Sequence, residues 1–453
     1  MESGRLFSRP VRKRFWVHNL GMNKTNVAIV GLGNVGTGVA RLLLDKGDRT
    51  AKYAGRTLWL KHIVVRDLKK ARDVDLPADI LTDDLQKLVD DDEVEVVAQL
   101  IGGVEPARTI MLQLLESGKD IVTANKALLA VHGPELFERA RELGRSIAFE
   151  ASVAGGIPIV ANIGQCLAAN QITSIRGILN GTCNYIISRM DKEGVEYSAC
   201  VGAAQELGFA EAEPTMDVDG SDAAQKLAIL AQLAFGVAAD WQKIDRRGID
   251  DLDLSDIAYA KEIGYRVKQI AFGELSQEGV LLIVAPMLVR VGTPLAEVTA
   301  NYNAVSVVGD SVGPVFFHGQ GAGAMPTASA VVADMIDTAV GRTKLTFQTL
   351  KLWSPEEVLV SIADTGKLAA RFYMRFNVKD QPNVLADISG ILGRHGISIA
   401  SVYQHDRDIS DDGTVPLVIV THLTTHQDSA AAIEEISKLD SIQPGTERLK
   451  ILD

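Results

Sequence analysis

The chain has 453 residues, a hydrophobic fraction of 47%, a charged fraction of 23% and a formal net charge of −12. Its length predicts about three domains, and its acidic balance argues against nucleic acid as a main partner, because phosphate neutralisation needs clustered Lys and Arg. The cysteines form no paired motif, so a reducing compartment is favoured over a disulfide framework or zinc site. Since no apolar run reaches the ~20 residues of a membrane helix, we expect a cytoplasmic protein with no membrane partner.

Residues 1–22 hold the only markedly basic stretch, at residues 9–14. A secretory signal would need an apolar segment of useful length after these residues, and none follows. We therefore predict a disordered N-terminal extension, with Met22 as an alternative start.

From residue 23 to about residue 155, short apolar runs alternate with segments of helical spacing. This alternation predicts βαβ units and a parallel sheet, and so a Rossmann-type nucleotide domain of the α/β class that a later segment at about 311–342 completes. Strands are expected at residues 26–30, 58–65, 94–101, 120–123 and 146–149, and helices at residues 34–44, 83–89, 106–116 and 134–143.

The remaining chain is predicted to form two further units. Residues 156–310 favour an α+β domain, with helices expected at 221–233 and 254–268. Residues 343–370 are interpreted as a linker, with an extra strand and helix as the alternative. Residues 371–453 predict the order strand, helix, strand, strand, helix, strand, which is the ferredoxin-like pattern.

A glycine-rich loop follows the first predicted strand and opens a helix. In this context G-x-G-x-x-G indicates dinucleotide binding, because glycines let the backbone approach a pyrophosphate and the helix N-terminus supplies N–H donors. An ordinary turn is the alternative. Cofactor contacts are expected from Gly31, Gly33, Asn34, Val35 and Gly36.

The second predicted strand ends next to Arg66 rather than at an acidic residue. Arginine can bind a 2′-phosphate as a planar fork, so the sequence favours NADP over NAD. Asp67 keeps NAD open as the alternative, and Lys69 and Lys70 are interpreted as solvated charges.

Three further stretches suggest catalytic groups. Thr123 and Lys126 lie at the C-terminal end of a strand, on the ligand side of the expected sheet, so both are assigned to the cofactor site. A carboxylate-rich segment, residues 208–226, places Asp222 and Lys226 four residues apart on one helix face. A solvated salt bridge is an equally good interpretation of that pair from its position alone.

The stretches TANKALLA, EASVAGGIPI, GILNGTCNYI and LGFAEAEPTMDVDGSDAAQKLAIL together resemble homoserine dehydrogenase, and the resemblance covers nearly the whole chain from about Met22. It implies an NAD(P)-dependent oxidoreductase that interconverts L-homoserine and L-aspartate 4-semialdehyde, on the branch to threonine, methionine and isoleucine. It also implies that residues 156–310 form a substrate-binding and dimerisation domain in a homodimer or homotetramer.

The resemblance also implies residue roles. Lys226 matches the general acid/base, and Lys126 matches a second lysine close to cofactor and substrate. Glu211 matches the carboxylate that binds the substrate amino group, while Asp217 and Asp222 match carboxylates that orient substrate and lysine. A neighbouring ammonium lowers a lysine pKa and carboxylates raise it; the sequence leaves open which effect is larger.

Two other sites are implied in the same way. A structural monovalent cation, such as sodium or potassium, is expected at a site formed largely by backbone carbonyls of Glu150, Val153, Gly155 and Ile157. Gly321, within GQGAG, matches a late glycine that returns to the cofactor.

The start of the C-terminal unit, DQPNVLADIS from Asp380, resembles the first loop and helix of an ACT domain. Such domains bind small amino acids, and the implied effector is L-threonine acting by feedback inhibition. Asn383 replaces the usual glycine, and asparagine tolerates left-handed geometry, so the turn can survive. A purely structural oligomerisation module is the alternative.

Two rival functions remain from the sequence. Another semialdehyde or amino-acid dehydrogenase is disfavoured by the Glu211 and Lys226 pattern and by the lack of a nucleophilic cysteine motif. A catalytically silent amino-acid sensor that keeps the nucleotide fold is disfavoured by the presence of both Lys126 and Lys226.

Overall fold

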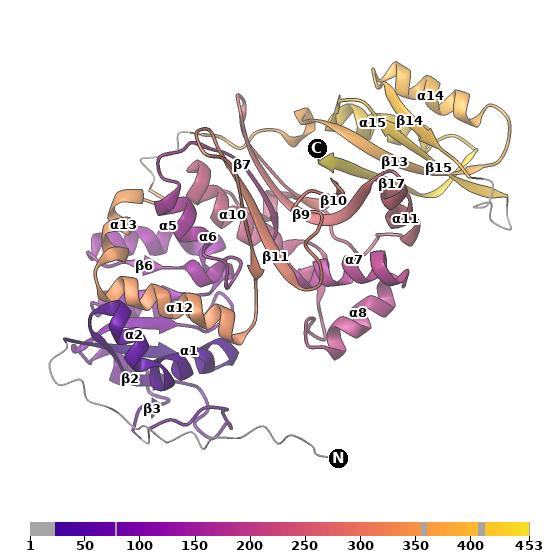
Figure 1. Cartoon of the computed structure of the whole chain (residues 1–453). Helices are drawn as coiled ribbons and strands as arrows, with labels where there is room; N and C mark the ends of the chain where they lie inside the picture. The colour runs from indigo at the N-terminus through magenta and orange to yellow at the C-terminus, as the bar shows by residue number, and fades with distance from the viewer. Residues whose placement is uncertain (1–22, 78, 355–359, 406–412, 453) are drawn as a thin grey trace, which may run out of the picture.

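The computed structural model describes residues 23–77, 79–354, 360–405 and 413–452, so the predicted extension at residues 1–22 lies outside the described residues. The chain forms three bodies in a row: an N-terminal unit in indigo and purple, a central unit built on a long sheet, and a C-terminal unit in yellow (Figure 1). Among the described residues, no helix has both the length and the apolar character needed to cross a membrane.

The N-terminal unit is built on six parallel strands in the order β3-β2-β1-β4-β5-β6. In this order the direction of strand addition reverses between β1 and β4, which leaves a crevice at their carboxyl ends. The predicted parallel Rossmann-type sheet is therefore confirmed. The strands are β1 (Lys24–Val30), β2 (Thr57–Val64), β3 (Leu81–Thr82), β4 (Val94–Gln99), β5 (Asp120–Thr123) and β6 (Ile147–Ala148).

Apolar helices cover this sheet, because parallel strands are buried on both faces. The late helix α12, in orange, packs beside α1, in indigo, so the C-terminal half of the chain contributes to the first unit (Figure 1). The helices are α1 (Asn34–Asp45), α2 (Gly47–Ala54), α3 (Gln86–Val89), α4 (Ala107–Glu116), α5 (Lys126–Glu142), α6 (Ile159–Ala161), α12 (Ala324–Ala339) and α13 (Arg342–Leu350).

Helix α5 corrects the prediction of a helix that starts at residue 134. The Asn125 side chain accepts a hydrogen bond from the Leu128 N–H at 3.0 Å and caps a helix that begins at Lys126. Pro134, where the predicted helix began, lies inside this helix. The predicted start was too late because the capping by Asn125 was not considered.

The second sheet has eleven strands, nine of them in the order β12-β11-β7-β9-β10-β17-β13-β15-β14, with the short β8 and β16 paired to β10 and β13. Its central part is a long antiparallel hairpin of β9 and β10. The strands are β7 (Ile172–Ile178), β8 (Asp245–Arg246), β9 (Tyr265–Ser276), β10 (Gly279–Arg290), β11 (Tyr302–Gly309), β12 (Gly313–Gln320), β13 (Ala369–Lys379), β14 (Ile399–Tyr403), β15 (Thr414–Thr421), β16 (Thr424–Thr425) and β17 (Ile442–Leu452).

The helices of the central unit are α7 (Gly181–Glu193), α8 (Tyr197–Glu206), α9 (Thr215–Val218), α10 (Ser221–Phe235) and α11 (Leu254–Glu262). A helix predicted at residues 254–268 is wrong in its second half, where β9 begins at Tyr265. Pairing with β10 and β7 satisfies the backbone of this segment, and such long-range partners are invisible to local periodicity.

The C-terminal unit has the predicted order of strands and helices, with α14 (Val384–Arg394) and α15 (His426–Ile436). Its last strand, β17, also pairs with β10 of the central unit, so one continuous sheet joins the two bodies. The ferredoxin-like unit is therefore attached through backbone hydrogen bonds as well as side chains.

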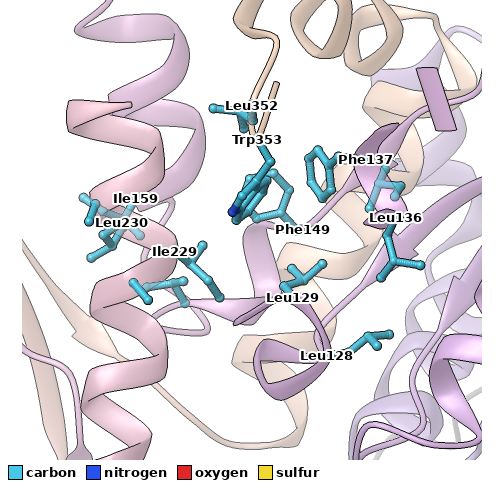
Figure 2. Packing of buried hydrophobic residues seen from close by; sticks show 14 of the residues in the cluster. Leu128, Leu129, Leu136, Phe137, Phe149, Ile159, Ile229, Leu230, Leu352 and Trp353 are labelled. Atoms are coloured by element: carbon cyan, nitrogen blue, oxygen red, sulfur yellow. The ribbon is translucent and has the colours of Figure 1, made fainter. Parts of the chain in front are cut away.

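The largest core lies between the first sheet and α10. In Figure 2, Trp353 lies among Phe137, Phe149 and residues of α10, including Ile229. The ring centroids of Phe137 and Trp353 are 4.5 Å apart in an edge-on contact. Residues immediately after α13, within the segment interpreted as a linker, are thus packed into the core rather than extended over the surface.

Candidate functional site

The glycine-rich loop lies at the crevice between β1 and β4. Gly31 has a φ of 99°, and a Cβ on Gly36 would lie 2.2 Å from the Gly31 carbonyl oxygen, so both positions require glycine. In front of Gly33 there is open space: a Cβ there would meet nothing within 4 Å. Since α1 begins at Asn34, its N-terminal N–H groups are available for a pyrophosphate beside Gly33.

Arg66 follows the end of β2, on the same edge of the sheet, and is exposed. Within the described part of the chain, no hydrogen bond or ion pair holds its side chain. The neighbouring carboxylate of Asp67 accepts a bond from the Lys69 N–H at 2.8 Å and is engaged in its own turn. Arg66 is therefore the freer of the two side chains to meet a cofactor.

Asn125 joins the ends of β4 and β5, a role that was not predicted from the sequence. Its amide donates to the carbonyls of Ile101 at 3.0 Å and Gly103 at 2.7 Å. Because Asn125 also caps α5, these bonds fix the position of Lys126, the first residue of that helix. Thr123 is buried at the end of β5, where its hydroxyl accepts from the Asn125 N–H at 3.1 Å.

The two candidate lysines meet on one carboxylate. Lys126 Nζ lies 3.1 Å from Asp222 Oδ1, and Lys226 Nζ lies 2.7 Å from Asp222 Oδ2. The Lys226 ammonium also donates to the Leu179 carbonyl at 2.7 Å. Lys226 keeps 12% of its side chain exposed against 38% for Lys126. The solvated salt bridge considered for Asp222 and Lys226 is therefore wrong: the pair is buried and shared with a second lysine.

Asn180 is a further member of this cluster that the sequence analysis missed. Its amide donates to Asp217 at 2.8 Å and to Asp222 at 2.9 Å, so it joins the two candidate carboxylates. Its side-chain oxygen accepts from the Cys183 N–H at 2.8 Å, where it caps α7. The N-x-x-C spacing at a helix start was a capping signal that would have drawn attention to Asn180.

Electrostatics follow from these contacts. Burial alone would raise the pKa of Asp222, but the ammonium groups of Lys226 and Lys126 and the hydrogen bonds lower it to about 2. The charge of Asp222 raises the pKa of Lys126 more than burial lowers it. Burial raises the pKa of Asp217, against the hydrogen bond from Asn180. The sequence left open whether carboxylates or other effects would dominate the pKa of Lys126. In the structure the carboxylate of Asp222 has the larger effect, so this pKa is raised.

Glu211 is brought close to the cluster but not into contact with it. The residue is exposed, and its backbone carbonyl accepts from the Gln205 side chain at 3.3 Å. Its charge adds to those that raise the pKa of Lys126. The carboxylate therefore lies at the open side of the cluster, where a substrate ammonium could reach it.

The expected cation loop is buried next to α12. Both oxygens of Glu150 accept backbone N–H bonds at 2.8 Å, from Val160 and Ala161, and the Glu150 N–H donates to Asp334 at 2.9 Å. Burial raises the pKa of both carboxyl groups, and in Asp334 the charge of Glu150 adds to the effect. No basic side chain pairs with either group in the described ranges. Asp334 was missed by the sequence analysis.

The other predicted residues of this loop surround the same place. Val153 and Ile157 are fully or almost fully buried. The strand end before Gly321 binds the loop directly, since the Gly156 N–H donates to the Gln320 carbonyl at 3.0 Å. Gly155 and Gly321 are in close contact, because a Cβ on Gly155 would lie 2.5 Å from the Gly321 oxygen.

The C-terminal unit contains a cavity of about 460 Å³ at the start of α14. Asn383 caps this helix with a φ of 74°, so the left-handed turn is kept without glycine. The polar part of the lining comes from Lys379, Asp380, Gln381, Asn383, Ser389 and Gln404. Such a cavity offers both charges and a helix N-terminus to a small zwitterion.

Three protein-family models match successive parts of the chain. Residues 31–150 match the model described as homoserine dehydrogenase, NAD binding domain, and residues 158–336 match the model described as homoserine dehydrogenase. Residues 372–441 match the ACT domain. The second match includes most of α12, which packs onto the first sheet.

Individual relatives agree along nearly the whole chain. A homoserine dehydrogenase of Synechocystis sp. is 41% identical over 94% of this chain and 99% of its own. The crystal structure of a homoserine dehydrogenase from Thiobacillus denitrificans has a TM-score of 0.89 at 38% identity, covering 96% of this chain and 99% of that one. A hyperthermophilic archaeal homoserine dehydrogenase in complex with NADPH has a TM-score of 0.59 at 25% identity, covering 69% of this chain and 97% of that one.

Proposed function

Because the chain belongs to the homoserine dehydrogenase family, an oxidoreductase family with an NAD(P)-binding domain and here an ACT domain, we propose how its own residues carry out the reaction. The proposal is that Lys226 and Lys126 interconvert L-homoserine and L-aspartate 4-semialdehyde with NADP in the cytoplasm, on the route to threonine, methionine and isoleucine. The observation that carries it is the Lys126–Asp222–Lys226 cluster beside the carboxyl edge of the first sheet.

We propose that Lys226 moves the proton. Its ammonium has three N–H donors, two of which are occupied by Asp222 and the Leu179 carbonyl. The third is left to donate its proton to the substrate oxygen when the aldehyde is reduced, which leaves a neutral amine. In the opposite direction the neutral amine of Lys226 accepts the hydroxyl proton. When bound, the nicotinamide cofactor supplies or accepts the hydride.

The remaining residues bind and orient. Asp222 holds both lysines in place as a permanent anion, since its pKa is lowered to about 2. Lys126 stays protonated, because Asp222 raises its pKa, and it supplies positive charge toward the substrate carboxylate and cofactor. Glu211 and Asp217 receive the substrate ammonium from the open side of the cluster.

NADP is proposed over NAD because Arg66 is exposed and free at the end of β2. We expect Arg66→Glu to raise the KM for NADP by about 10- to 100-fold, since a hydrogen bond to a charged group contributes about 1.5–3 kcal/mol. The KM for NAD should change little. Initial rates with each cofactor at saturating homoserine measure both constants.

Lys69→Ala is the control for Arg66→Glu. It removes a positive charge three residues after Arg66, from a side chain that is exposed to solvent. An equal rise in the KM for NADP in both variants would show that general charge, and not a fork from Arg66, attracts the cofactor.

We also propose that the loop with Glu150, Val153, Gly155 and Ile157 holds a structural sodium or potassium ion. Two observations support this proposal: Glu150, Val153 and Ile157 are buried, and no basic side chain pairs with Glu150 or Asp334 among the described residues. Replacing sodium and potassium salts by choline chloride at equal ionic strength should lower the thermal midpoint, since a ligand at 100 times its Kd stabilises by about 2.7 kcal/mol. Identical melting curves in the three salts would contradict the site.

L-Threonine is proposed as the effector at the cavity beside Asn383. Titration with threonine should inhibit homoserine oxidation in the wild type. Asn383→Val should abolish the response, because a β-branched residue is strained at a φ of 74°. The ratio of rates with and without threonine is the measurement, and an unchanged ratio in the wild type would leave the ACT unit with a structural role.

We propose that the chain forms a homodimer or homotetramer in which the β12 edge of the second sheet contacts a second copy. Among the described residues, strand β12 pairs on one edge only, and it exposes Phe316, which stacks with His318. An open edge with aromatic side chains is a surface that a second copy would cover. Light scattering at several protein concentrations tests this assembly.

A further inference from the structure

Arg247 connects the ACT unit to the central unit through one ion pair. It follows β8 and donates from Nη2 to Glu447 Oε2 of β17 at 2.6 Å, while its Nη1 contacts the second carboxylate oxygen. The Glu447 side chain is 4% exposed, so the pair is shielded from water on the ACT side. The hydrogen bond that Arg247 donates to Glu447 raises the pKa of the guanidinium, in spite of burial. A planar two-point contact of this kind fixes orientation as well as distance.

The residues after Arg247 contact the segment from Asp217 to Asp222, which we call the substrate loop. The Ile249 N–H donates to the Val218 carbonyl at 2.9 Å. Gly248 packs against the same carbonyl so closely that an added Cβ would lie 2.4 Å from it. Val218 directly follows Asp217 and ends helix α9, so the segment from Arg247 to Ile249 lies against the backbone that positions Asp217.

Asp217 and Asp222 lie at the two ends of this loop, and Asn180 holds both from the other side. A movement of Val218 therefore changes the geometry of the two carboxylates relative to each other. The backbone of Arg247 is also anchored to β10, where its N–H donates to Val284 at 2.8 Å. The guanidinium thus adds a direct side-chain contact to β17, next to the backbone pairing of β10 with β17.

We infer that Arg247 and Gly248 are positioning residues that let the ACT unit set the affinity for homoserine. Glu447 orients Arg247, the Arg247–Ile249 segment supports Val218, and Val218 places Asp217 for the substrate ammonium. The inference rests on the proposed role of Asp217. No change is expected at the cofactor site, because Gly31 and Arg66 follow strands of the first sheet, and Arg247 belongs to the second-sheet region.

The test compares steady-state constants of the full chain for Arg247→Gln, Arg247→Lys, Glu447→Gln and the double variant of Arg247→Gln with Glu447→Gln. We expect the KM for L-homoserine to rise by about two- to thirtyfold in either single glutamine variant, the range for coupling carried by a packed network. The kcat and the KM for NADP should stay close to wild type. The KM for L-homoserine of the double variant should be no higher than that of either single glutamine variant. Arg247→Lys keeps the charge, so its KM should lie between those of the wild type and Arg247→Gln.

Two further variants separate positioning from general stability. Gly248→Ala leaves the ion pair intact but crowds the Val218 carbonyl, so it should raise the same KM. Arg394→Gln removes an exposed ion pair to Glu435 inside the ACT unit and should leave every constant unchanged. Folding of each variant is verified by circular dichroism.

The inference is overturned if folded Arg247→Gln has the wild-type KM for homoserine, or if the effects of the two single variants add fully. If Arg247→Gln does not fold, wild-type constants in both Glu447→Gln and Gly248→Ala overturn it instead. Absence of turnover in the wild type is a different result, which contradicts the proposed function and not the contact.

Discussion

Lys226→Ala is expected to lower kcat for homoserine oxidation by about 10²- to 10⁴-fold, the usual contribution of a positioned general acid or base. The reason is that Lys226 is the more buried of the two lysines and has a defined donor left for the substrate oxygen. Absorbance of the reduced nicotinamide, followed with L-homoserine and either NADP or NAD, gives the rate directly. Thermal unfolding of the variant tests that the loss is chemical.

Lys226→Arg distinguishes proton transfer from simple charge. Arginine keeps the positive charge but does not release its proton near neutral pH, so this variant should be almost as slow as Lys226→Ala. Lys243→Ala, at a side chain that is 82% exposed, is the unaffected control. Near-normal kcat in Lys226→Arg would reject the acid/base role, and a folded wild type that turns over with neither cofactor would favour the silent-sensor alternative.

Asp256→Ala is expected to produce the largest loss of stability, about 3–5 kcal/mol, which is typical when one partner of a buried ion pair is removed. Asp256 on α11 accepts from Arg375 Nε at 2.6 Å, from Arg375 Nη2 at 2.9 Å and from the Tyr373 hydroxyl at 2.9 Å. Its side chain is 0% exposed and that of Arg375 7%. Alanine would leave the Arg375 charge buried and unpaired at the junction with the ACT unit.

Urea unfolding, followed by circular dichroism and tryptophan fluorescence, measures this loss as a shift of the midpoint. Because a chain with several bodies need not unfold in one step, the two signals should separate in the variant if the ACT unit detaches first. Lys438→Ala is the matched control, since it breaks an exposed pair with Glu434 within the ACT unit and should leave the midpoint almost unchanged. Equal midpoints for Asp256→Ala and the wild type would contradict a stabilising role for this junction.

Local patterns in the sequence were sufficient for much of the fold. Alternating apolar runs and helical segments predicted the parallel sheet, because strands that are buried on both faces are continuously apolar. The glycine spacing predicted the tight loop after β1, since Gly31 and Gly36 occupy positions where a side chain would collide with the backbone. The order of elements in the C-terminal unit was likewise predicted correctly.

Errors arose where a distant partner or a cap outweighed local periodicity. Residues 265–268 were predicted to be helical but belong to β9, whose backbone pairs with β7 and β10. The start of α5 was placed too late because the cap by Asn125 was overlooked. In the first case the deciding hydrogen bonds are made by the backbone of distant strands, and in the second by the Asn125 side chain. The spacing of apolar residues contains no information about either.

The sequence by itself determined which residue types were available for the chemistry and placed Asp222 four positions before Lys226 on one helix face. Only the tertiary structure decided that Lys126 from α5 shares that carboxylate, that Asn180 joins Asp222 to Asp217, and that β17 extends the sheet of the central unit. The physical reason is that helical and strand periods state which face of an element is buried. They do not state which other element buries it, and the electrostatics of this site depend on that partner.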